Sequence, residues 1–147
     1  MKKIILLVSL VLITALQLSA QKSPVFVSSG SAIHGYDAVA YFKEGKAVKG
    51  RETFVFEWHG GKWNFSSQQN LDSFKTNSLK YAPQYGGYCA YGMSEGHKAP
   101  TDPDAWTIIN GKLYFNYNLK VRELWRNKTE ERIQVADKNW PLIKDKE

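Results

Sequence analysis

Apolar and polar residues alternate in two stretches, as they do in half-buried β-strands. In the first stretch, 52–58 and 62–65 flank the turn His59-Gly60-Gly61. In the second, 106–109 and 112–115 flank Asn110-Gly111, a dipeptide that strongly favours a tight hairpin turn. The sequence therefore predicts two β-hairpins, over 52–65 and 106–115.

Helical spacing and capping residues predict the helices between and after these hairpins. Leu71 and Phe74 lie three apart, on one face of a predicted helix. The final helix opens at Thr129-Glu130-Glu131-Arg132 and is expected to end at about Trp140, before Pro141. The expected helices are 38–42 capped by Asp37, 68–76 capped by Ser66 or Ser67, 119–126 capped by Asn118, and 129–140.

A glycine-rich stretch, 85–97, has a different character from the rest of the chain. Four glycines fall between positions 86 and 96, and each is unfavourable in a helix by ~1 kcal/mol relative to alanine. Such glycines are typical of close backbone approach or of special dihedral angles. We expect a short, broken helix here, and one short strand around 25–27 in the Ser-rich lead-in.

Strands, hairpins and helices are mixed along the chain, which indicates the α+β class. We expect the two hairpins to join one small antiparallel sheet, since the apolar face of each must be covered. The helix 68–76 is expected to pack on one face of that sheet.

The first twenty residues have the order of a secretory signal peptide. Lys2 and Lys3 precede an apolar run, and Leu18-Ser19-Ala20 supplies a small residue at the cut position. A membrane anchor is the alternative, because Leu18 is large for its place, but a run of ~13 residues is short of the ~20 that span a bilayer. We expect cleavage before Gln21, export to the periplasm or the medium, and no stable membrane span in the mature chain.

The remaining residues have room for one domain. We expect a lead-in over 21–32 and a single domain with C-terminal helices over 33–147. Of 147 residues, 14% are aromatic and one is cysteine, which excludes a disulfide framework and zinc modules with several cysteines. The formal net charge is +6, or +4 without Lys2 and Lys3; the charges are scattered, so we expect no nucleic-acid partner.

Three segments together resemble the YHS domain family, in particular its secreted or periplasmic single-domain branch. The segments are Gly35-Tyr36-Asp37-x-Val39-Ala40-Tyr41-Phe42, Gly61-Lys62-Trp63-x-Phe65-x-Ser67-x-x-Asn70-x-x-x-Phe74, and Tyr81-Ala82-Pro83-x-Tyr85-Gly86-Gly87-Tyr88-Cys89-Ala90-Tyr91-Gly92. The resemblance runs from about residue 33 to 117. It implies metal binding, with copper as the candidate metal, through a pair of cysteines. Here Ser66 to Asn70 occupy the usual cysteine positions, and Cys89 alone remains.

Cys89 is therefore the central candidate for chemistry. Soft sulfur ligands favour Cu(I), and Met93 lies on the same helical face as Cys89. His97 could join them only if the chain turns back at Gly96, and His34 is the other candidate ligand. As alternatives, Cys89 is a plain core residue, or a nucleophile with His34 or His97 as base and Asp37 as orienting group. No spacing supports the nucleophile, so we favour binding over catalysis.

The aromatic side chains offer a third class of function, a metal-free module that binds a small molecule or a partner. Rings around the glycine-rich stretch are numerous enough to line a pocket, although many must also fill the core. His59, beside two glycines, is expected to be merely exposed. The candidate pocket residues are Tyr36, Asp37, Trp63, Tyr85, Tyr88 and Tyr91, with Trp58 and Trp106 as further rings near them.

Overall fold

The computed structural model describes residues 23–146, and the predicted signal peptide lies outside them. In chain order the described elements begin with β1 (Val27–Ser28), β2 (Ser31–Ala32), the 3-10 turn η1 (Ile33–Gly35), α1 (Ala38–Lys43), β3 (Arg51–Trp58), β4 (Gly61–Phe65), α2 (Gln68–Thr76) and α3 (Ser78–Tyr81). They continue with the 3-10 turn η2 (Gln84–Gly87), α4 (Ala90–Ser94), β5 (Trp106–Ile109), β6 (Lys112–Phe115), α5 (Leu119–Arg126) and α6 (Thr129–Ile143). This mixture confirms the α+β class.

Both predicted hairpins are present, but the prediction that they join one sheet is wrong. Within residues 23–146 the strands form three separate antiparallel pairs: β1 with β2, β3 with β4, and β5 with β6. The free edge of β6 is taken by the glycine-rich stretch, since Cys89 forms a parallel bridge with Phe115. Both faces of β6 are covered without a shared sheet: Leu113 and Phe115 join one apolar cluster and Tyr114 joins another. A shared sheet is therefore unnecessary to cover it.

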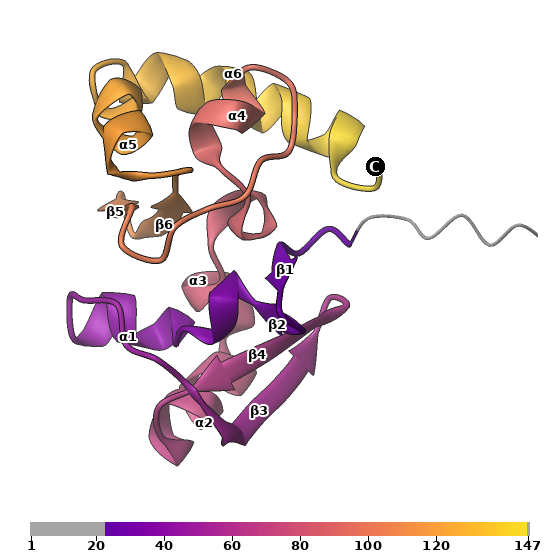
Figure 1. Cartoon of the computed structure of the whole chain (residues 1–147), viewed down its shortest axis with the longest axis vertical. Coiled ribbons are helices and arrows are strands. Elements are labelled where there is room, and N and C mark those ends of the chain that lie inside the picture. Colours follow the sequence, from indigo (N-terminus) through magenta and orange to yellow (C-terminus); the bar gives the residue numbers. More distant parts are fainter. Residues whose placement is uncertain (1–22, 147) are drawn as a thin grey trace, which may run out of the picture.

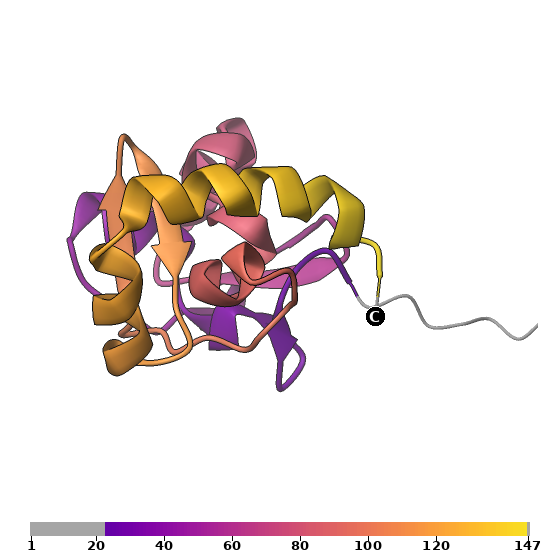
Figure 2. The same ribbon diagram turned by 90° about the horizontal axis from the view of Figure 1, so that it is seen from above.

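The described residues form two apolar clusters. Figure 1 shows α1, α2, β3 and β4 in its lower part and α4, α5, α6, β5 and β6 in its upper part. The first cluster lies between α1, α2 and the β3–β4 hairpin, and its rings pack around Phe74, with Trp63 and Phe65 at 5.2 and 5.1 Å between ring centroids. The second lies under α6 and is built around Trp125 and Met93, both fully buried. Figure 2 shows α6 lying across the top of the molecule and the C-terminus beside the start of the described chain.

Capping side chains begin the helices where the sequence predicts. Asp37 caps α1, Ser67 caps α2 and Asn118 caps α5, each accepting from a backbone N–H of the first turn. The end of the last helix was predicted wrongly, because α6 continues through Pro141 to Ile143. The proline removes only one N–H near the helix end, and the last turn still closes with Lys144 N–H donating to the Trp140 carbonyl at 2.9 Å.

The Asp37 carboxylate is fully buried and connects three elements. Its Oδ1 accepts from the N–H groups of Val39 and Ala40 at 2.9 and 3.1 Å, at the start of α1. Its Oδ2 accepts from the N–H and hydroxyl of Ser66 at 2.8 and 2.6 Å, just after β4, and from the Asn70 amide of α2 at 2.8 Å. A buried carboxylate is tolerable only when its acceptor sites are filled, as they are here.

We predict that Asp37→Asn destabilises the fold almost as much as Asp37→Ala. The new amide would point N–H groups at Ser66 and Asn70, which are themselves donors, so buried donors are left unpaired. The free energy of unfolding should fall by about 3 kcal/mol or more, against ~1–2 kcal/mol for Ser66→Ala, which removes one donor. Urea unfolding followed by circular dichroism measures both. A stability of Asp37→Asn within ~1 kcal/mol of the parent would contradict this account.

Candidate functional site: an aromatic cleft

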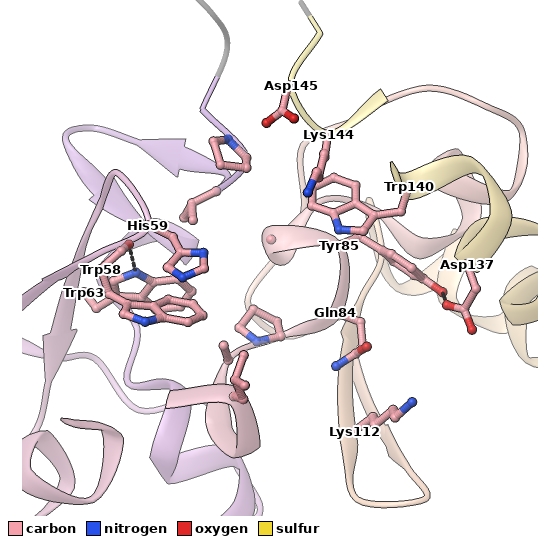
Figure 3. Close-up of a pocket in the computed structure, with 16 residues that line it drawn as sticks. Trp58, His59, Trp63, Gln84, Tyr85, Lys112, Asp137, Trp140, Lys144 and Asp145 are labelled. Atoms are coloured by element: carbon pink, nitrogen blue, oxygen red, sulfur yellow. Dashed lines mark hydrogen bonds between the residues drawn. The ribbon is translucent and has the colours of Figure 1, made fainter. Parts of the chain in front are cut away.

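An open cleft of about 650 Å³ lies between the turn of the β3–β4 hairpin and the C-terminal half of α6 (Figure 3). We call it the aromatic cleft. Segments far apart in the sequence line it: Pro24, Val25, Trp58, His59, Trp63, Leu79, Ala82, Pro83, Gln84, Tyr85, Gly86, Lys112, Asp137, Trp140, Lys144 and Asp145.

The wall on the hairpin side is a stack of rings. His59 lies over Trp58 with 3.8 Å between ring centroids, and Trp58 meets Trp63 edge to face at 5.9 Å. The Trp63 indole N–H donates to the Trp58 carbonyl at 3.0 Å, which fixes the two rings relative to each other. His59 has a left-handed backbone, with φ of 49°, as the first residue of the two-residue turn His59-Gly60. This turn conformation places the His59 imidazole over the Trp58 ring.

Tyr85 and Trp140 form the opposite wall, with 6.1 Å between their ring centroids. Tyr85 is buried, and its hydroxyl donates to Asp137 at 2.8 Å. Burial, followed by the hydrogen bond and the negative charge of Asp137, raises the pKa of Tyr85 far above its ordinary value. The phenol therefore keeps its proton at neutral pH and stays a donor to Asp137.

The backbone of η2 forms the base of the aromatic cleft and needs glycine. Tyr85 and Gly86 both have left-handed φ angles, of 55° and 61°. A Cβ atom on Gly86 would lie 1.8 Å from the Pro24 carbonyl oxygen, so only glycine lets the lead-in pack here. The Phe26 N–H donates to the Gly86 carbonyl at 2.8 Å and ties the two segments together. The expectation of close backbone approach in the glycine-rich stretch is confirmed.

Charged side chains stand at the ends of the aromatic cleft. Figure 3 shows Lys144 and Asp145 at one end and Lys112 at the other, with Gln84 between Tyr85 and Lys112. All three charged residues are exposed. Among the ion pairs of residues 23–146, none involves these lysines or Asp145. The site therefore combines apolar ring surfaces with two amino groups that form no ion pair within residues 23–146.

Cys89 lies outside the aromatic cleft and is 1% exposed. It caps the short helix α4: its Sγ accepts from the Gly92 N–H at 3.4 Å and lies 3.6 Å from the Asn116 amide oxygen. Burial raises the pKa of the Cys89 thiol, and the hydrogen bonds from Gly92, Tyr117 and Tyr91 only partly oppose this. A neutral thiol that donates to Asn116 fits these contacts.

Of the other predicted metal ligands, His97 lies near the helix that Cys89 caps, whereas the side chains of Met93 and His34 have other surroundings. The chain turns back at Gly96, with φ of 88°, and a Cβ atom on Gly92 would lie 3.3 Å from His97 Nε2. His97 is therefore near α4, but exposed, whereas Met93 is fully buried in the second cluster. His34 Nε2 instead lies 2.6 Å from the Thr101 carbonyl oxygen. Within the described part of the chain, no three His, Cys, Asp or Glu side chains are placed to hold a metal ion.

The six predicted pocket residues lie in different places. Trp63 and Tyr85 line the aromatic cleft, and Tyr88 borders a smaller cavity of about 180 Å³ under Lys98. Tyr36 and Tyr91 are covered by cations, Lys49 at 4.8 Å and Arg132 at 3.8 Å from the ring centroids. Asp37 lies in the core, as described above.

Sequence reasoning missed half of the aromatic cleft. Trp140 was expected only as the end of a helix, and His59 only as an exposed turn residue. No sequence motif around Lys112 or Lys144 identifies either residue as part of a binding site. The one available signal was the tail Asn139-Trp140-Pro141, where a large ring directly precedes a proline.

None of the helices within residues 23–146 has both the length and the apolar character of a membrane span.

Comparison with known proteins identifies one family. No curated protein and no solved structure matches the chain significantly. Residues 39–85 match the family model of the YHS domain, a family associated with metal binding. The matched segment runs from α1 to η2 and supplies Trp58, Trp63 and Tyr85. The resemblance to the YHS domain family is thus confirmed over residues 39–85.

Proposed function

We propose that this chain is an exported binding protein that holds a small organic molecule in the aromatic cleft. The observation that carries the proposal is the cleft itself: its volume falls within the ~300–1,000 Å³ of ordinary ligand sites, and rings from two distant segments face it. Export rests on the order of residues 1–20 and is tested by the intact mass of the exported chain, which should begin at Gln21.

An exposed apolar side chain supports the same site. Leu79, 80% exposed, adds an apolar side chain at the rim. An apolar group left in water beside a cleft is typical of a surface that a ligand covers.

We predict that the neutral dye N-phenyl-1-naphthylamine binds in the aromatic cleft with one dye per chain. Leu79→Glu should weaken binding at least about fivefold, because a ligand would then desolvate a charge. Trp140→Ala should weaken it at least about tenfold by removing one wall. Dye fluorescence titration measures each affinity, and circular dichroism confirms that each variant is folded.

Leu142→Glu is the matched control for Leu79→Glu. Leu142 is also exposed, at 66%, but does not line the aromatic cleft, so its variant should bind the dye like the parent. Unsaturable dye binding, or an equal loss in the two glutamate variants, would contradict the proposed function.

Copper binding through Cys89 is a second candidate. The observation that favours it is the return of the chain at Gly96, which brings His97 against Gly92, whose N–H contacts the Cys89 sulfur. The burial of the thiol and its raised pKa weigh against it, because the thiolate is the metal-binding form.

Thiol labelling separates these two roles. We predict that iodoacetamide labels Cys89 at pH 8 at least about tenfold more slowly in the native protein than in denaturant. If Cys89 binds copper, Cu(I) must slow native labelling further, and Cys89→Ser must lose one equivalent of bound Cu(I). Slow labelling that Cu(I) does not change would remove the copper candidate and leave Cys89 as a helix cap.

A further inference from the structure

The charges around the aromatic cleft point to the kind of ligand. We propose that the ligand is an organic anion with a flat apolar body, held by the rings and by the amino groups of Lys112 and Lys144. This inference rests on the proposed function and narrows it to one chemical class.

The two lysines are available for such a ligand. Both line the aromatic cleft, both are exposed, and neither forms an ion pair with another described residue. They come from different elements: Lys112 begins β6, and Lys144 follows α6. Each therefore stands at one end of the aromatic cleft. An anionic group near either amino group gains a favourable charge interaction, which the neighbouring apolar walls strengthen relative to open water.

Two carboxylates, those of Asp137 and Asp145, also line the aromatic cleft. Asp137 already accepts the Tyr85 hydroxyl, and Figure 3 shows it at the edge of the cleft away from the hairpin wall. Asp145 is exposed at the same end as Lys144 but forms no ion pair with it, and solvent screens both of these charges. The mature chain is also basic, since 18 basic and 14 acidic residues remain without Lys2 and Lys3, so the long-range field attracts anions.

The rings are arranged for a flat apolar body rather than for a cation. An aromatic cage binds a cation over open ring faces. Here one face of Trp58 is covered by His59 at 3.8 Å, and one face of Trp63 by Phe74 at 5.2 Å. The hairpin wall therefore presents a stacked imidazole and ring edges to the cleft. Such a wall packs against a planar apolar group and offers no ring cage for an ammonium.

A matched pair of dyes tests the charge. N-phenyl-1-naphthylamine is neutral, and 8-anilinonaphthalene-1-sulfonate carries the same ring system with a sulfonate. The ratio of their affinities isolates the charge from the apolar body. In the double variant Lys112→Gln/Lys144→Gln, we expect the affinity for the sulfonate to fall about tenfold while the affinity for the neutral dye changes less than about twofold.

Lys138→Gln is the control, because Lys138 is exposed on α6 but does not line the aromatic cleft, and this variant should keep the parent ratio. Raising the salt concentration should reproduce the effect of the double variant in the parent. An unchanged ratio in the double variant, or tighter binding of a trimethylammonium analogue of the dye, would overturn the anion proposal with the binding function intact. If neither dye binds, the proposed function itself fails.

Discussion

The buried carboxylate of Asp37 holds the first half of the molecule together. Five hydrogen bonds to one side chain place the start of α1, the end of β4 and the first turn of α2 around a single point. Because β4 is fixed there, the hairpin that it forms with β3 projects in one direction and carries Trp58 and His59 at its turn. The hairpin wall of the aromatic cleft thus depends on a polar contact at the opposite end of the same hairpin.

Local features of the fold could be predicted, because local residues decide them. Asp37, Ser67 and Asn118 satisfy N–H groups within three residues, and Asn110-Gly111 adopts the turn that its own angles favour. The pairing of the hairpins depends instead on which segment reaches the edge of β6, and Cys89 takes that place. The aromatic cleft escaped prediction for the same reason, since Trp58 and Trp140 meet across it only after the chain has folded.

The YHS segment and the C-terminal helix contribute differently to the site. The family match, residues 39–85, includes the hairpin wall and Tyr85, whereas Trp140 and the two lysines come from outside it. The family is associated with metal binding, yet the one cysteine of this chain, Cys89, is a buried cap on α4. We infer that the C-terminal elements of this chain turn the outer face of its YHS segment into one wall of a cleft for an organic ligand.

The position of a bound molecule tests this account most directly. The five tryptophans give separate indole N–H signals in a ¹H–¹⁵N spectrum, and they divide into two groups: Trp58, Trp63 and Trp140 line the aromatic cleft, while Trp106 and Trp125 do not. Titration with 8-anilinonaphthalene-1-sulfonate should shift the signals of the first group and leave those of Trp106 and Trp125 in place. Equal shifts in both groups, or shifts confined to Trp106 and Trp125, would contradict the account.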